Sequence, residues 1–455
     1  MKNLLIGACI GTAINPCMSY AGNENSPLQT YRCEMMTPGG VLPFILSYED
    51  TTEYWDSAPV FSFVISNGDE RIVIPQSETV GRTEHFGGNE GVLEVRSRRS
   101  RMDLRLRFDV YDSELSWHRW YGFQPTDSGI HAEGVWKKFR NENYVELPVV
   151  FIELDGSMEE NQSSRFVPIP EELIEVNNDS AVTFEGQWAV QFESSNDLAI
   201  GTFTVDDNQL ATGTFLTTTG DYRYLAGRVD GNIMRLSTFD GAHAFLFHAR
   251  MQEDGTIEGD FWSGNWWHET WTAKRDDNAM LPDAFEQTIV TDESKLNELV
   301  FKDLDGNPTR VLDLFTETNA KARVIEIFGS WCPNCGDAAR ELVSLKKMYG
   351  DKLAVVGLAF ELTEDFERSV NQVERHHEHI GSDWPILIAG LNDKDKATKT
   401  LGFLDQVRSY PTLVFLNEHN EVMSVYSGFS GPATGDAYSE QRTRFENLID
   451  KLIEE

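Results

Sequence analysis

Two cysteines separated by two residues, Cys332 and Cys335, have the residue type and spacing that thiol chemistry requires. They lie between an apolar run typical of a buried strand and a run typical of an amphipathic helix. This order places Cys332 at the start of the helix, where unpaired backbone N–H groups and the helix dipole stabilise a thiolate. The pattern predicts a redox disulfide, in which Cys332 attacks a substrate disulfide and Cys335 resolves the mixed disulfide.

A Cys-x-x-Cys pair can also bind zinc, but a zinc site needs a second pair of ligands at a matching spacing. The other cysteines are Cys9, Cys17 and Cys33, and they supply no such pair. We therefore expect no metal. No Gly-rich phosphate loop follows a predicted strand, so we expect no nucleotide or flavin cofactor either. Cys33 is expected to be a small buried residue, with a third redox thiol as the alternative.

One acidic residue precedes the cysteine pair inside an apolar run. Glu326 lies six residues before Cys332, and strand alternation points its side chain inward, beneath the cysteines. Burial of an unpaired carboxylate is costly and raises its pKa toward neutrality, which suits a proton acceptor and donor for Cys335. The alternative is a carboxylate that reaches the sheet edge and solvent.

A proline directly before a predicted strand is the third element of the candidate site. Pro411 precedes the apolar run 413–416. A cis Tyr410–Pro411 bond would bend the chain toward the cysteines and free backbone groups to pair with an extended substrate. We expect Trp331, Pro333 and Tyr410 to contact the substrate.

The elements that must position these residues alternate between strand and helix. Strand 323–328 precedes the cysteines, helix 333–349 follows them, and helix 363–380 comes after a further strand. The last helix carries an apolar stripe at i, i+3, i+4, i+7 and i+8. Residues 292–455 are thus predicted to form an α/β domain.

The preceding residues have strand patterns instead. Residues 28–154 predict a β-rich domain, and residues 183–274 predict about eight antiparallel strands joined by hairpins, as an up-and-down barrel or a sandwich. Polar linkers, 155–180 and 275–295, separate these domains. Five tryptophans of the second domain can line a ligand cavity, although core and rim packing is the favoured interpretation: Trp188, Trp262, Trp266, Trp267 and Trp271.

Length and charge restrict the function further. The chain has 455 residues, 39 Lys and Arg against 74 Asp and Glu, and a formal net charge of -35. The length predicts about two to four domains. The charge argues against binding to nucleic acid or to an anionic membrane, because phosphates would be repelled.

The N-terminus has the pattern of an export signal. Lys2 provides a positive charge, the run 4–14 is apolar, and small residues at Ser19 and Ala21 favour cleavage before Gly22. Residues 1–21 are thus predicted to be a signal peptide, with a buried first helix as the alternative. We expect an exported, periplasmic protein that is soluble rather than lipid-anchored.

The motifs together resemble a known family. Residues 292–455 resemble the thioredoxin superfamily, in particular its TlpA/ResA-like exported thiol–disulfide oxidoreductases, through the segments FKDLDG (301–306), WCPNC (331–335) and YPTLVFL (410–416). The resemblance implies that Cys332 is the nucleophile, Cys335 the resolving cysteine and Pro411 the cis-proline. It also implies a disulfide-containing protein substrate and a membrane thiol donor.

The chain departs from its relatives at two positions. Ala338 stands where some relatives place an acid, and Glu326 stands where many have Asn and resembles the buried acid of thioredoxin.

Our interpretation is a thioredoxin-like oxidoreductase that reduces protein disulfides outside the cytoplasm, with two β-rich modules preceding the thioredoxin-like domain in the chain. One alternative is a β-module binding or scaffold protein for a glycan, lipid or client, with a secondary redox domain, and another is a disulfide oxidant. A closed, dry barrel would count against the binding protein.

Overall fold

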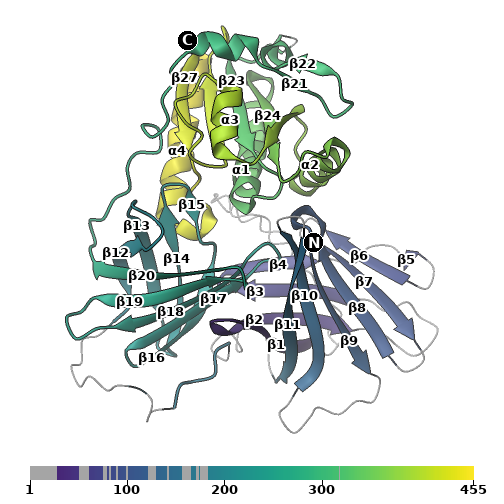
Figure 1. Cartoon of the computed structure of the whole chain (residues 1–455), viewed down its shortest axis with the longest axis vertical. Coiled ribbons are helices and arrows are strands. Elements are labelled where there is room, and N and C mark those ends of the chain that lie inside the picture. Colours follow the sequence, from purple (N-terminus) through teal and green to yellow (C-terminus); the bar gives the residue numbers. More distant parts are fainter. Residues whose placement is uncertain are drawn as a thin grey trace, which may run out of the picture.

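The computed structural model describes residues 28–50, 61–74, 79–80, 83–88, 91–98, 101–120, 130–140, 143–155, 165–170, 174, 183–316 and 318–454. The predicted signal peptide, 1–21, lies outside the described residues. Three sheets organise the chain, and Figure 1 shows the α/β part lying across two β modules. No helix among the described residues is long and apolar enough to cross a membrane.

The first β module is one antiparallel sheet of eleven strands in the order β4-β3-β2-β1-β11-β10-β9-β8-β7-β6-β5. One face is buried because apolar side chains alternate with polar ones, as in Leu104, Leu106 and Phe108. A 3-10 turn, η1 (Asp109–Tyr111), follows β8. The strands are β1 (Leu28–Thr37), β2 (Gly40–Asp50), β3 (Phe61–Asn67), β4 (Glu70–Ile74), β5 (Thr79–Val80), β6 (Thr83–Gly88), β7 (Gly91–Arg98), β8 (Arg101–Phe108), β9 (Ser113–Trp120), β10 (Ile130–Arg140) and β11 (Asn143–Leu154).

The second β module is a closed antiparallel barrel of eight strands, and each strand pairs with its neighbours in sequence. The up-and-down barrel prediction is confirmed and the sandwich alternative is wrong, because β13 pairs with both β12 and β14 and closes the sheet. The strands are β12 (Gly186–Phe192), β13 (Ala199–Val205), β14 (Leu210–Thr217), β16 (Leu225–Asp230), β17 (Ile233–Phe239), β18 (Ala244–Met251), β19 (Ile257–Ser263) and β20 (Trp267–Arg275), with the short β15 (Gly220–Asp221) beside β14.

Aromatic rings occupy the barrel interior. The ring of Phe247 lies 4.7 Å from that of Phe215 and 4.5 Å from that of Phe261, measured between centroids. Trp188 and Trp271 are buried in this core. Such packing leaves the barrel as a core rather than a ligand site, which counts against the binding-protein alternative.

The remaining tryptophans do not line a cavity either. Trp262 and Trp266 pack from outside the barrel against the core of the first β module, and Trp267 is 46% exposed. Their position follows from strand alternation: Phe261 points into the barrel, so Trp262 points out. The two β modules therefore share one apolar interface.

A buried arginine adds polar contacts to this interface. Arg165 donates from Nη2 to Asn67 Oδ1 at 2.9 Å and from Nε to Ser237 Oγ at 3.0 Å. Cys33 lies in the same shared core and is fully buried, and burial raises the pKa of its thiol. Burial shields the thiol from oxidants in the solvent, which suits the packing role expected for it.

The α/β domain has a seven-stranded sheet in the order β22-β21-β25-β24-β23-β26-β27, with β23, β24 and β25 parallel. Its strands are β21 (Val300–Lys302), β22 (Pro308–Arg310), β23 (Ala322–Phe328), β24 (Leu353–Glu361), β25 (Ile386–Leu391), β26 (Thr412–Leu416) and β27 (Val422–Ser427). Its helices are α1 (Pro333–Tyr349), α2 (Phe366–Ile380), α3 (Lys394–Leu401) and α4 (Asp436–Glu454).

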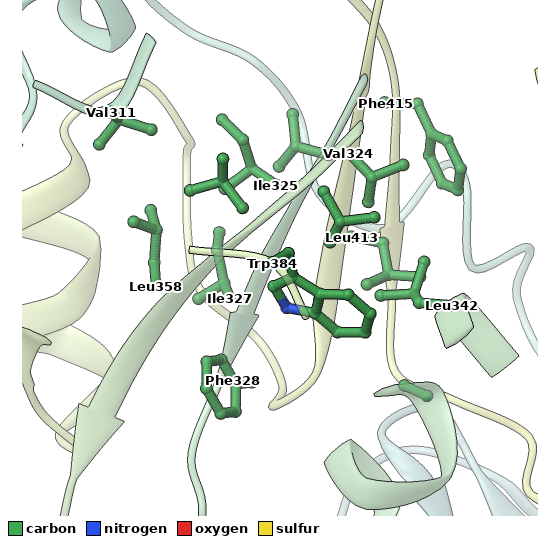
Figure 2. Close-up of a cluster of buried hydrophobic side chains, with 14 of the residues drawn as sticks. Val311, Val324, Ile325, Ile327, Phe328, Leu342, Leu358, Trp384, Leu413 and Phe415 are labelled. Carbon is green, nitrogen blue, oxygen red and sulfur yellow. The ribbon is translucent and has the colours of Figure 1, made fainter. Parts of the chain in front are cut away.

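The core of this domain lies between the central strands and the helices. Figure 2 shows Val324 of β23, Leu413 of β26 and Leu342 of α1 close together in this core. The helix predicted to begin at residue 363 begins instead at Phe366, because the Asp365 side chain caps it by accepting from the Arg368 backbone N–H.

Candidate active site

The cysteine pair lies where the sequence predicts, at the start of α1. Cys332 is the N-cap residue, and its Sγ accepts from the Cys335 backbone N–H at 3.4 Å. Pro333 occupies the first helical position, where a missing N–H costs nothing. Cys332 is 8% exposed and Cys335 is fully buried. Only the first sulfur is therefore within reach of a substrate.

The segment around Tyr410 and Pro411, called the proline loop below, lies directly against Cys332. The Tyr410–Pro411 peptide bond is cis, as the sequence interpretation required. The Cys332 thiol donates to Tyr410 O at 3.5 Å. The rings of Tyr410 and Trp331 meet edge to face with centroids 5.8 Å apart. Trp331, Pro333 and Tyr410 thus surround the pair, and their contact with a substrate stays a prediction.

Glu326 lies inside the sheet. On β23 it pairs with Gly357 of β24 on one side and Leu413 of β26 on the other, so the alternative of a carboxylate at the sheet edge is wrong. It is 1% exposed, and its Oε1 has no hydrogen-bond partner among the described residues. Burial, and secondarily the nearby Cys332, raise the pKa of Glu326 to about 8.

The second thiol also needs a base. Burial, followed by the influence of Cys332, raises the pKa of Cys335 well above its ordinary value. A protonated thiol is a poor nucleophile, so Cys335 must lose its proton before it can resolve a mixed disulfide. Glu326 is the buried carboxyl group that influences both cysteines electrostatically.

A second buried carboxyl group, Glu361 at the end of β24, orients the turn before Cys332. The Ser330 backbone N–H donates to Glu361 Oε1 at 2.9 Å, and the Ser330 hydroxyl donates to Oε2 at 2.7 Å. Burial raises the pKa of Glu361 to about 7 despite these bonds. The sequence analysis missed this residue, although an acid at the end of an apolar strand beside the Cys332 strand was an available signal.

Both β modules contact the α/β domain close to the cysteine pair, which sequence reasoning also missed. Gly220 of β15 lies against the Asn334 side chain, between the two cysteines in sequence. Arg223 of the barrel forms an ion pair with Asp337 on α1. From the first β module, Asp112 pairs with Arg368 of α2 at 2.5 Å. No group of three or more metal-binding side chains occurs among the described residues.

Known proteins resemble part of the chain. The thiol-disulfide oxidoreductase ResA of Halalkalibacterium halodurans is 28% identical over 137 residues, which cover 28% of this chain and 64% of that protein. The thioredoxin-like protein YneN of Bacillus subtilis is 29% identical over 127 residues, which cover 28% of this chain and 66% of that protein. The chain thus spans less than two thirds of each relative.

Solved structures are also similar to part of the chain. A secreted Mycobacterium tuberculosis disulfide oxidoreductase is 17% identical, with a TM-score of 0.24, and the alignment covers 32% of this chain and 96% of that one. No family model matches the chain. The curated relatives support a thioredoxin-superfamily, TlpA/ResA-like domain in this chain, although the coverage is only partial.

Proposed function

We propose that the chain is a thiol–disulfide oxidoreductase that reduces protein disulfides outside the cytoplasm through Cys332 and Cys335. The arrangement of Cys332 is the observation that carries this proposal. Its sulfur accepts the Cys335 N–H at the N-terminus of α1 and lies 3.5 Å from the carbonyl oxygen that precedes the cis-proline, Pro411. This position puts the sulfur at the N-terminal end of the helix dipole and beside a backbone edge with which an extended substrate can pair.

The reaction follows from the burial of the two thiols. Cys332 Sγ attacks one sulfur of the substrate disulfide, and the other substrate sulfur leaves and takes up a proton. Cys335 then gives its proton to the ionised carboxylate of Glu326 and attacks Cys332 Sγ. The Cys332–Cys335 disulfide forms as the mixed disulfide breaks, and the second substrate sulfur leaves and is protonated. The substrate gains two electrons and two protons in total.

A dithiol donor must then restore the pair. It attacks the Cys332–Cys335 disulfide, returns two electrons to the enzyme and is itself oxidised to a disulfide. A membrane thiol donor fits the proposed export of the chain, because the predicted signal peptide, 1–21, would place the mature protein outside the cytoplasm.

Trapping of the mixed disulfide tests the assignment of roles. Cys335→Ser leaves the attacking thiol and removes the resolving one, so a substrate should stay covalently attached and be seen on a non-reducing gel. Cys332→Ser should trap nothing. Cys33→Ser is the matched control and should turn over like the wild type, because Cys33 is buried in the β modules. Equal trapping by the two active-site variants would contradict the proposal.

The reduction potential of the pair decides the direction of electron flow. A value near or below about -250 mV, in the range of thioredoxin, supports a reductase. A value near about -120 mV would identify a disulfide oxidant and overturn the proposed direction. Thiol labelling and mass spectrometry across a dithiothreitol series provide the measurement.

A further inference from the structure

One segment of the barrel lies on three parts of the α/β domain that frame the cysteine pair. This segment, the barrel loop, is residues 217–223 and includes β15. Its first contact is with the redox motif itself. Gly220 approaches the Asn334 amide so closely that a Cβ at position 220 would overlap it. Asn334 lies between the two cysteines, so the loop contacts the turn that carries them.

The second contact is with the segment next to the cis-proline. The backbone N–H of Gly428 donates to Pro411 O at 3.0 Å, which joins residues 428–431 to the proline loop. Thr218 O would lie 2.7 Å from a Cβ on Gly428. The Gly431 N–H donates to Asp221 Oδ2 at 2.7 Å. The barrel loop is therefore bonded to the α/β domain beside the proline loop.

The third contact holds the loop in place. Arg223 has a left-handed backbone, with φ of 63°, which a residue with a Cβ adopts only where its surroundings demand it. Its guanidinium pairs with Asp337 on α1, with Glu70 at 3.2 Å and with Asp240 at 3.4 Å. One side chain thus joins the first β module, the barrel and the cysteine-bearing helix.

The first β module provides a wall on another side of the pair. Asp112, after η1, lines one small pocket together with Ser330 and Trp331, the two residues before Cys332. The Tyr111 hydroxyl would lie 3.9 Å from a Cβ on Gly336, in the first turn of α1. Segments from both β modules therefore border the redox motif.

We propose that the barrel loop sets the substrate specificity of the redox site. It admits disulfides carried by small molecules or by thin, flexible peptide segments, and it excludes disulfides on the surface of a folded protein. Reacting atoms must come within about 3–3.5 Å of each other in the attacking geometry. A broad protein surface would meet the barrel loop and η1 before its sulfur reached Cys332, which is 8% exposed. The inference rests on the proposed function and narrows its substrate class.

Two disulfides of different bulk test this proposal on the reduced full-length chain. The probes are oxidised glutathione and folded insulin. For each disulfide, the rate of reduction by the wild type is divided by the rate of reduction by free dithiothreitol. We expect this ratio to be at least about tenfold higher for glutathione disulfide than for insulin. Gly220→Ala adds a methyl group that overlaps the Asn334 amide, so the loop and this side chain must separate. It should raise the ratio of the insulin rate to the glutathione rate about tenfold.

A matched glycine controls for backbone effects. Gly255 lies in another barrel hairpin with φ of 80°, and a Cβ there would meet no atom within 4 Å. Gly255→Ala should therefore change neither rate. The proposal is overturned if the wild type shows no size preference, or if Gly220→Ala and Gly255→Ala leave the insulin rate equally unchanged. Thermal unfolding of both variants verifies that they fold.

Alkylation separates this proposal from the proposed function. Iodoacetamide and a bulky polyethylene-glycol maleimide compete for Cys332, and neither reaction requires turnover. We expect the bulky reagent to react slowly with the wild type and faster with Gly220→Ala. Equal size dependence in the two proteins would overturn the role of the loop. Size-selective alkylation without reduction of either disulfide would support the role of the barrel loop and contradict the proposed oxidoreductase function.

Discussion

Arg223 of the barrel and Asp337 of α1 form an ion pair across the boundary between the β modules and the α/β domain. Their side chains are 11% and 6% exposed, so the pair is almost fully removed from solvent. Arg223 also faces the carboxylates of Glu70 and Asp240. Asp337 follows Cys335 by two residues on α1. The ion pair therefore attaches the helix that bears the redox pair to the barrel.

Removal of this arginine should destabilise the docked chain. Arg223→Ala leaves the carboxylates of Glu70, Asp240 and Asp337 buried together without their shared cation. Loss of one partner of a buried ion pair costs about 3–5 kcal/mol. We expect the free energy of the first unfolding transition in urea to fall by that amount, monitored by tryptophan fluorescence.

A second barrel arginine provides the control. Arg228 pairs with Asp230 at 2.7 Å, but its side chain is 22% exposed and Asp230 keeps Arg235 as a partner. Arg228→Ala should cost only about 0–1 kcal/mol. Similar losses in the two variants would show that the contact between Arg223 and Asp337 adds nothing to docking.

The stability of the chain should depend on pH through Glu326. The folded protein holds this proton up to a pKa of about 8, whereas the ordinary value is 4.5. The native state therefore binds the proton more tightly than the unfolded state does. This contribution is complete below about pH 4.5 and is lost as the pH rises through 8. It amounts to about 5 kcal/mol.

Glu326→Gln removes this titration while it keeps the shape of the side chain. The variant should lose less stability than the wild type between pH 5 and pH 9, as measured by urea unfolding at both values. Other buried groups titrate in both proteins. The difference between the two pH dependences of stability is therefore the contribution of Glu326. Parallel pH curves would mean that the carboxyl group is hydrated and that its pKa is ordinary.

The same substitution should slow resolution of the mixed disulfide. Glu326→Gln removes the carboxylate that accepts the Cys335 proton, so it should reduce the rate of this step about 10²-fold at pH 8, where about half of the Glu326 carboxyl groups are ionised. Attack by Cys332 on glutathione disulfide should keep its wild-type rate. Rapid acid quenching followed by mass spectrometry separates the two steps. Glu374→Gln, an exposed substitution on α2, is the control; equal rates in both variants would exclude Glu326 from proton transfer.

Local patterns were sufficient to predict the centre of the site and its supporting elements. Helix α1 begins at Pro333, as predicted, because a proline in the first helical turn and an apolar run before it are local signals. The barrel could be predicted equally well from the sequence, since Asp-Gly turns such as Asp254-Gly255 mark its hairpins. The side-chain direction of Glu326 followed from alternation along β23.

The contacts between the modules could not be predicted in this way. Arg223 and Asp337 are 114 residues apart, and neither has a neighbour that signals a partner. The left-handed backbone of Arg223 has no signature either, because glycine or asparagine is the usual residue there. Gly220 reads as an ordinary turn residue, and its contact with Asn334 arises only when the barrel meets the α/β domain.

The packed interior of the barrel leads to the last prediction. The Phe215 ring lies 5.3 Å from Phe203, 4.7 Å from Phe247 and 5.1 Å from Trp271. Phe215→Ala should leave a cavity and cost about 3–5 kcal/mol in urea unfolding. Met280→Ala, at a side chain that is 81% exposed, should stay within about 0.5 kcal/mol. A small cost for Phe215→Ala would instead point to an interior with room for a ligand.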